Sequence, residues 1–116
     1  MIILAALLTI ANPAADDPPA MPTCEGADDC AAKWGRALRW VMDRNPVLVE
    51  QSESLIRTGP AAYAVANFYQ VTRIPDGGGR YTIDLRIGCA NELWGCKWKA
   101  EKRAFTAHVM ASPVRQ

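Results

Sequence analysis

The segment from Arg80 to Cys89 constrains the fold more than any other stretch of the chain. Its apolar side chains fall on one face and its polar side chains on the other: Tyr81, Ile83, Leu85, Ile87 and Cys89 against Arg80, Thr82, Asp84 and Arg86. This alternation predicts a β-strand with one buried side and one solvent-facing side. A strand of this kind is typical of an antiparallel sheet that helices cover on a single face.

Two segments with helical spacing lie on either side of the strand region. Apolar side chains recur at helical spacing in residues 29–45 and, along a narrower stripe, in residues 97–112. Asp28 or Asp29 is expected to accept hydrogen bonds from the first turn of the first helix. Pro46 is expected to end that helix, because it disfavours helical geometry in the residue before it.

Strand composition occurs in two further segments. Residues 47–58 have β-branched and aliphatic ends, which favours an edge strand, although a helical spacing also fits them. Residues 68–74 have strand composition too, and a glycine-rich turn at 75–79 joins them to the strand that begins at Arg80. We therefore predict an α+β fold, a two-layer sandwich in which a three-stranded antiparallel sheet packs against an N-terminal and a C-terminal helix.

The beginning of the chain indicates export. Residues 2–11 are an apolar run that is too short to span a bilayer but typical of the central region of a signal peptide; a buried element of the fold is the alternative. Cleavage is expected after Ala11 or Ala15, which would place the protein in the periplasm or outside the cell. The predicted organisation is a signal peptide at 1–15, a flexible linker at 16–23, a single domain at 24–112 and a tail at 113–116.

Four cysteines in an exported domain predict two disulfides. We favour Cys24 with Cys30 and Cys89 with Cys96, because each pair lies on a short loop. A long-range pairing between the start of the first helix and the end of the third strand is the alternative. Zinc held by four thiolates is disfavoured by the wide spacing within each pair and by an oxidising compartment.

Composition and motifs argue against several classes of function. Lys and Arg number 13 and Asp and Glu 12, so the formal net charge of +1 favours neither nucleic acid nor an anionic membrane as a partner. The order of elements is shared with double-stranded RNA-binding domains, but the chain lacks their basic cluster, and we expect no nucleic-acid partner. Residues 77–79 lack the Lys and Ser or Thr of a phosphate-binding loop and are interpreted as a hairpin turn.

The sequence contains no recognisable catalytic constellation. A Cys/His nucleophile would need an unbridged cysteine near His108, which is expected to be a packed or surface histidine. Asp28 and Asp29 are explained as helix caps, and Asp84 lies on the wet face of a strand. We therefore predict no catalytic residues, no cofactor and no metal.

An aromatic and basic segment follows the third strand. Trp34 and Trp40 are interpreted as structural, whereas Trp94 lies inside the Cys89–Cys96 loop, where a closed loop would hold it as an anchor. The alternative is that Trp94 covers the edge of the sheet. The candidate interaction surface consists of Trp94, Lys97, Trp98, Lys99, Lys102 and Arg103. An acidic partner fits these cations, and solvated surface charge is the alternative.

The chain resembles a family of small exported proteins. The residues that carry the resemblance are Cys30, Lys33, Trp34, Ala37, Trp40 and Val41, then Val71 to Arg73 and Gly77 to Tyr81, then Cys89 to Asn91, Gly95 and Cys96. They are similar to uncharacterised disulfide-containing proteins of Gram-negative bacteria, over residues 24–109. The resemblance implies a periplasmic or secreted location and disulfides, and it carries no catalytic residues across. Trp94 and residues 97–103 lie outside the recognised part.

Together these features predict a non-enzymatic exported protein that binds an envelope or extracellular partner. A small disulfide-containing hydrolase or a thiol redox enzyme is one alternative. A purely structural accessory domain of the envelope is another.

Overall fold

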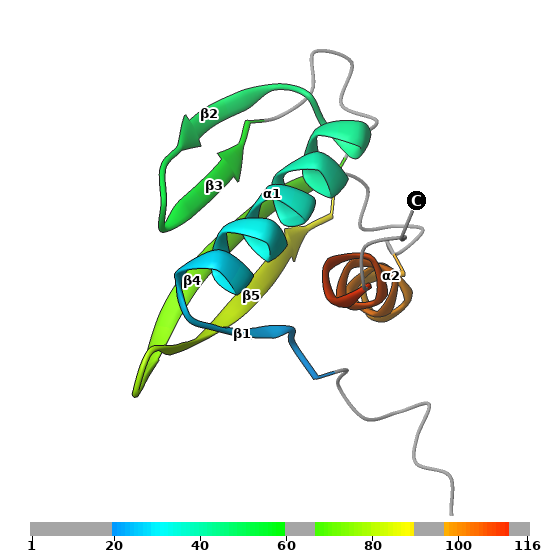
Figure 1. The fold of residues 1–116 in the computed structure, drawn as a ribbon. Coiled ribbons are helices and arrows are strands. Elements are labelled where there is room, and N and C mark those ends of the chain that lie inside the picture. The colour runs from blue at the N-terminus through cyan, green and yellow to red at the C-terminus, as the bar shows by residue number, and fades with distance from the viewer. Residues whose placement is uncertain (1–19, 60–66, 90–96, 112–116) are drawn as a thin grey trace, which may run out of the picture.

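The computed structural model describes residues 20–59, 67–89 and 97–111 and shows one sheet with two helices (Figure 1). The elements run in the order β1 (Thr23–Glu25), α1 (Ala27–Arg44), β2 (Leu48–Gln51), β3 (Leu55–Thr58), β4 (Phe68–Gly77), β5 (Arg80–Gly88) and α2 (Trp98–Met110). The sheet has five antiparallel strands in the order β1-β5-β4-β3-β2. The α+β class is confirmed, but the predicted three-stranded sheet is wrong.

One of the two additional strands comes from residues 47–58, which form a hairpin and not a single edge strand. The polar middle of this segment is a turn: the Ser52 hydroxyl accepts hydrogen bonds from the backbone N–H groups of Ser54, at 3.2 Å, and Leu55, at 3.1 Å. The Ser52 N–H donates to the Leu55 carbonyl at 2.9 Å. Serine hydroxyls favour turns through bonds of this kind, so the run of polar residues marked the bend between β2 and β3.

The other additional strand is β1, which begins inside the segment predicted to be a linker. Cys24 lies opposite Tyr81 of β5, and the Ile83 N–H donates to the Pro22 carbonyl at 2.8 Å. Pro22 is fully buried, and Met21 packs against the core. Three residues are too short to show an alternating pattern, which is why the composition of the segment concealed this strand.

Both helices pack on the same face of the sheet and share its core. Ile83 and Leu85 of β5 are fully buried beneath Val41 of α1 and Phe105 of α2, as the alternation in β5 predicted. Trp40 makes edge-on contacts with Tyr69, at 5.5 Å between ring centroids, and with Phe105, at 5.2 Å. Such aromatic pairs contribute about 0.5–1.5 kcal/mol beyond the area that they bury.

The two tryptophans of α1 differ in burial. Trp40 is 3% exposed and lies in the core. Trp34 is only partly buried, and its indole N–H donates to the Ser52 carbonyl at 3.0 Å, which ties α1 to the turn between β2 and β3. Both residues are structural, as predicted, but in different ways.

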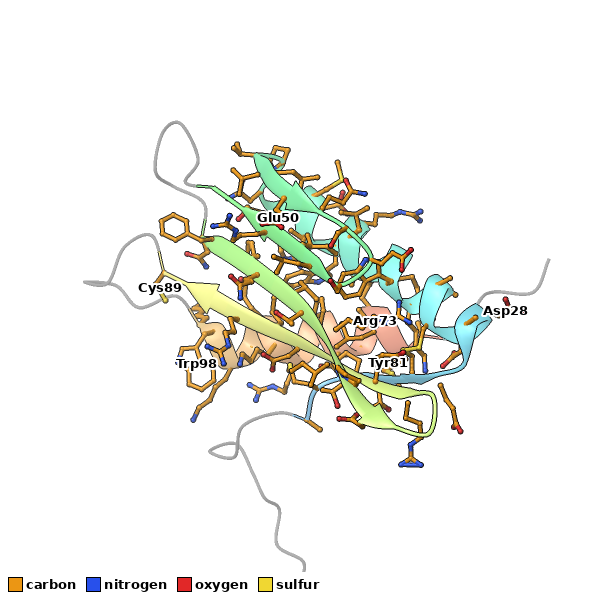
Figure 2. All side chains as sticks on the ribbon, turned by 90° about the vertical axis from the view of Figure 1, so that its left-hand side faces the viewer. Asp28, Glu50, Arg73, Tyr81, Cys89 and Trp98 are labelled. Atoms are coloured by element: carbon orange, nitrogen blue, oxygen red, sulfur yellow. A yellow bond between two sulfur atoms is a disulfide. The ribbon has the colours of Figure 1, made fainter. Side chains whose placement is uncertain are left out.

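The opposite face of the sheet is open, and no helix in the described part of the chain covers it (Figure 2). Its side chains alternate with the buried ones along each strand. They are Leu55 and Arg57 of β3, Phe68, Gln70, Thr72 and Ile74 of β4, and Thr82, Asp84 and Arg86 of β5. This mixed face, with an exposed phenylalanine and two exposed arginines, is the first of the surfaces that could bind a ligand.

Candidate functional site

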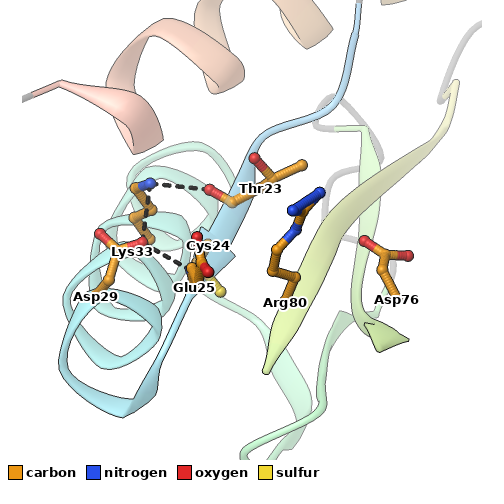
Figure 3. A pocket seen from close by; sticks show the side chains of 7 residues that line it. All are labelled: Thr23, Cys24, Glu25, Asp29, Lys33, Asp76 and Arg80. Atoms are coloured by element: carbon orange, nitrogen blue, oxygen red, sulfur yellow. Dashed lines mark hydrogen bonds and ion pairs between the residues drawn. The ribbon is translucent and has the colours of Figure 1, made fainter. Parts of the chain in front are cut away.

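A polar hollow of about 270 Å³ lies between β1, the start of α1 and the hairpin that joins β4 to β5 (Figure 3). The charged residues around it come from β1, α1, β4 and β5. Figure 3 shows Asp29 and Lys33 on α1 on one side and Asp76 and Arg80 on the other, with Thr23 and Glu25 of β1 between them. Asp29 and Lys33 bond to each other and to the backbone of β1.

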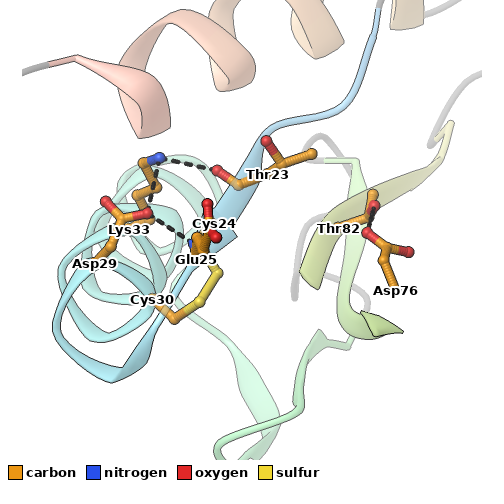
Figure 4. The surroundings of a disulfide bond; sticks show 8 residues. All are labelled: Thr23, Cys24, Glu25, Asp29, Cys30, Lys33, Asp76 and Thr82. Atoms are coloured by element: carbon orange, nitrogen blue, oxygen red, sulfur yellow. Dashed lines mark hydrogen bonds and ion pairs between the residues drawn. A yellow bond between two sulfur atoms is a disulfide. The ribbon is translucent and has the colours of Figure 1, made fainter. Parts of the chain in front are cut away.

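A disulfide between Cys24 and Cys30 forms the base of this region (Figure 4). It joins β1 to the first turn of α1, and both cysteines are buried. The predicted pairing of Cys24 with Cys30 is therefore confirmed, and the long-range alternative is wrong. Cys89 is disulfide-bonded too, whereas Cys96 lies outside the described residues. A zinc site built from all four thiolates is incompatible with these bonds.

Asp29 and Lys33 close the outer edge of β1. The Asp29 carboxylate accepts a hydrogen bond from the Glu25 N–H at 2.9 Å, and the Lys33 ammonium donates to the Thr23 carbonyl at 2.9 Å and to Asp29 at 3.1 Å. The backbone bond from Glu25, followed by the bond from Lys33, lowers the pKa of Asp29. These side chains occupy backbone groups that an edge strand otherwise presents to other chains.

The predicted capping role of the aspartates is wrong. Gly26 stands at the cap position of α1 with φ at 83°, and no side chain caps the helix. A positive φ is available to glycine at little cost, and it lets the chain turn from β1 directly into α1. Asp29 consequently serves the neighbouring strand instead of its own helix.

A second hollow, of about 370 Å³, lies beside the far end of β5 and the start of α2. It is lined by Arg86, Ile87, Trp98 and Lys102. The Trp98 side chain is 41% exposed, and the ammonium groups of Lys99 and Lys102 each lie 5.5 Å from the centroid of its ring. Figure 2 shows Trp98 next to the end of β5, near Cys89.

Several residues of the predicted interaction surface are brought together here. Lys97 immediately precedes α2, with φ at 52°, and Trp98, Lys99, Lys102 and Arg103 lie on the first turns of the helix. Trp94, predicted as the anchor, lies outside the described residues. We call the described group, together with Arg86, the basic surface: Arg86, Lys97, Trp98, Lys99, Lys102 and Arg103.

The sheet contributes candidate binding residues that the sequence did not reveal. Arg57, Phe68 and Arg86 are far apart in the chain, but the strand register places them around a hollow of about 390 Å³ on the open face. Alternation alone placed Arg86 on the wet side of its strand. The neighbours of Arg86 on β3 and β4 depend on the register, which the sequence of one strand does not contain.

Glu101 holds the start of α2 against the rest of the fold. Its carboxylate accepts a hydrogen bond from the Tyr69 hydroxyl at 2.5 Å and pairs with the Arg44 guanidinium at 3.4 Å. Burial, and then the bond to Glu101, raise the pKa of Tyr69, so the phenol stays a neutral hydrogen-bond donor. This arrangement makes Glu101 a structural carboxylate, and His108, predicted to be packed or at the surface, is exposed on the same helix.

Two further observations concern the described residues as a whole. No group of three His, Cys, Asp or Glu side chains within residues 20–59, 67–89 and 97–111 could hold a metal ion. In the same ranges, no helix is long and apolar enough to cross a membrane.

Comparison of the chain with protein-family models, with curated proteins and with solved structures gave no significant match. The resemblance to small exported proteins of Gram-negative bacteria therefore stays a prediction.

Proposed function

We propose that the protein is a non-enzymatic binding protein, exported to the periplasm or secreted, that recognises an acidic partner through the basic surface. The observation that carries this proposal is the setting of Trp98. Two ammonium groups each lie 5.5 Å from the centroid of its exposed ring, and the ring lines a hollow together with Arg86. Tryptophan and arginine are the residues that most often dominate binding energies at protein interfaces.

The charges at this surface favour an anionic partner. Cations in the first turn of a helix oppose the helix dipole, so their presence at the start of α2 has a small cost in stability. Glu101 is the acidic residue in that turn, and it is already engaged by Tyr69 and Arg44. An acidic ligand would offset the unfavourable charge, and the contacts between Trp98 and its lysines would hold the ring in place for it.

The test uses the disulfide-bonded chain without its predicted signal peptide and a fluorescent oligoglutamate peptide as the probe. We expect binding that weakens steeply with salt, because the surface and the probe attract through exposed charges. Replacing Trp98 by Ala and Lys102 by Glu together should weaken binding by about tenfold or more. Fluorescence anisotropy measures the affinity, and thermal melting checks that the variant is folded.

Arg39→Glu is the matched control for the change of charge. Arg39 is exposed on α1 and belongs to neither hollow, so its reversal should alter binding little. The proposal is wrong if Arg39→Glu weakens binding as much as the double variant does, or if oligoglutamate does not bind. Polygalacturonate and anionic lipid vesicles serve as parallel probes, and tighter binding to either would replace the acidic polypeptide as the expected partner.

A further inference from the structure

We propose that the open face of the sheet carries a second site, for a small planar anion, that is, a flat ring bearing a carboxylate or a phosphate. The open-face site consists of Arg57, Phe68, Gln70, Arg86 and Gly88. It goes beyond the proposed function, because it lies on the side of the sheet that faces away from the helices and asks for a different ligand. It shares Arg86 with the basic surface.

Strand register assembles this site from β3, β4 and β5. Arg57 lies opposite Gln70, and Gln70 lies opposite Arg86, so the three side chains form one row across the sheet. Phe68 lies opposite Gly88 in the next outward-facing row. The two arginines therefore stand about 10 Å apart at their backbones, with a neutral amide between them and a ring beside them. The hollow of about 390 Å³ falls in the range of small-molecule sites.

Gly88 lets the ring of Phe68 lie down on the sheet. A Cβ atom added at position 88 would lie 2.9 Å from Phe68 Cδ2, which is closer than such atoms approach one another, and 3.5 Å from Phe68 Cγ, which is van der Waals contact. The ring thus rests against the backbone of β5, and the side chain is still 39% exposed. An aromatic ring supported in this way offers a face on which a second flat ring can stack.

Both arginines have hydrogen-bonding capacity left for a ligand. Arg57 Nη2 lies 3.4 Å from Glu50, and Arg86 Nε lies 3.5 Å from Asp84. Charge-assisted bonds of this type are about 2.7–2.9 Å long at their strongest, so both ion pairs are loose. A guanidinium carries five N–H donors, and one nitrogen of each arginine takes part in these pairs. The Arg86 side chain is 77% exposed, which leaves it able to turn toward an anion.

Ring and charge together define the ligand. A simple anion would use the arginines and leave the supported face of Phe68 in water, and an uncharged ring would leave the guanidinium groups without a partner. A molecule with both features satisfies both, and its anionic group would compete with Glu50 and Asp84 for the arginines. Nucleotides and aromatic carboxylates share this chemistry, so the experiment includes one of each.

The experiment titrates the isotope-labelled, disulfide-bonded chain with adenosine monophosphate and, separately, with isophthalate. We expect saturable shifts of the backbone amide signals of Gln70, Arg86 and Gly88, with a Kd below about 1 mM. Adenosine alone and inorganic phosphate alone should each bind about tenfold more weakly than adenosine monophosphate. The nucleotide is the favoured ligand if it binds more tightly than isophthalate, and the aromatic carboxylate if the order is reversed.

Two substitutions test the two halves of the site. Arg57→Ala should weaken binding by about tenfold, because it removes charge-assisted hydrogen bonds. Phe68→Leu keeps an apolar side chain but loses the flat face, and it should weaken binding by about threefold or more. Arg39→Ala, outside the site, is the matched control for Arg57→Ala and should leave the affinity unchanged.

The proposal is overturned if neither ring-bearing anion binds, if the shifted signals lie elsewhere, or if Arg39→Ala weakens binding as much as Arg57→Ala does. Thermal melting of each variant separates a lost contact from lost folding, and the signal shifts locate the site in the unmodified chain whatever the variants do. Oligoglutamate carries no ring, so failure here and failure of the proposed function are measured with different probes.

Discussion

The two ends of β5 use charged side chains in opposite ways. At the β1 end, the Lys33 side chain is 14% exposed and bonds to both Thr23 and Asp29. At the α2 end, the Arg86 side chain is 77% exposed and has one loose carboxylate partner. Lys102, which forms no ion pair with the described residues, lines the neighbouring hollow there. Asp29 and Lys33 therefore stabilise the fold at the first end, whereas Arg86 and Lys102 line the surface at the second.

This difference separates structural charge from charge that is available for binding. The β1 edge is short, and it is covered by side chains of α1 and fixed by a disulfide, all of which protect it from pairing with another chain. The α2 end has exposed rings, namely Trp98 and Phe68, next to its cations. The net charge of +1 does not reveal this contrast, because it sums the charged residues of the whole chain.

Removing the Cys24–Cys30 disulfide should have the largest effect. The cysteines are 6 residues apart, and a loop of this size stabilises by about 2 kcal/mol on the chain-entropy estimate. The double substitution Cys24→Ser and Cys30→Ser should lower the melting temperature by about 10 °C. Oligoglutamate binding should persist, since the basic surface is at the other end. A melting temperature equal to that of the unmodified chain would show that β1 is held without the covalent bond.

Lys33→Met should follow, with a loss of about 1 kcal/mol from the hydrogen bond to Thr23. Methionine keeps a long apolar stem and removes the ammonium group. The Thr23 carbonyl then becomes available to another chain, so size-exclusion chromatography should show concentration-dependent association. Lys102→Met makes the same change of charge at the other end of β5 and is the control. It should associate no more than the unmodified chain does. Equal association of both variants would assign the effect to charge and not to the strand edge.

The sequence correctly predicted the features that follow from periodicity within one segment, namely the helices and the buried face of β5. The alternation in β5 identified its buried residues correctly, and α1 and α2 were found near their observed ends. The hairpin at Ser52 was missed because a polar run inside a strand and a turn between two strands have the same composition. The short β1 was missed because its strand character comes from pairing with β5 and not from its own residues.

The candidate sites divide in the same way. The segment from Lys97 to Arg103 is contiguous, so its basic and aromatic character could be recognised directly. Arg57 and Phe68 join Arg86 only through the register of three strands, and a single sequence does not specify that register. The wet face of β5 showed that Arg86 points outward, but nothing showed what lies next to it.

The contribution of Asp29 to stability should depend on pH. Its hydrogen bonds hold the pKa in the folded protein below the ordinary value of 3.8, so the unfolded chain takes up the proton first as the pH falls. The stabilisation is fully present above pH 3.8 and is lost as the pH falls through the folded pKa. Urea unfolding of the unmodified chain and of Asp29→Asn should therefore differ at neutral pH and converge in acid.

Asp28→Asn is the control for this pH dependence. Asp28 is exposed on the same helical turn and makes no hydrogen bond or ion pair with the described residues, so its substitution should give no comparable difference. The prediction is contradicted if the difference in unfolding free energy between the unmodified chain and Asp29→Asn stays constant down to acid pH. The stabilisation by Asp29 would then not depend on the charge of its carboxylate.

Trp98→Leu should have the smallest effect on stability, within about 0.5 kcal/mol, because the side chain is 41% exposed and the ammonium groups of two lysines lie near its ring. A Trp98 side chain packed in the core beside Phe105 would make the same substitution costly. Trp40→Leu provides the reference. Because Trp40 is 3% exposed, this substitution should lower the free energy of unfolding by about 2 kcal/mol or more. If urea unfolding shows comparable losses of unfolding free energy for both substitutions, Trp98 is a core residue and is not available as the anchor of the basic surface. A small loss of unfolding free energy for Trp98→Leu, together with weakened oligoglutamate binding, would show that binding and folding depend on different side chains at the α2 end. At the β1 end no such separation is expected, because the charged side chains there also hold the strand in place.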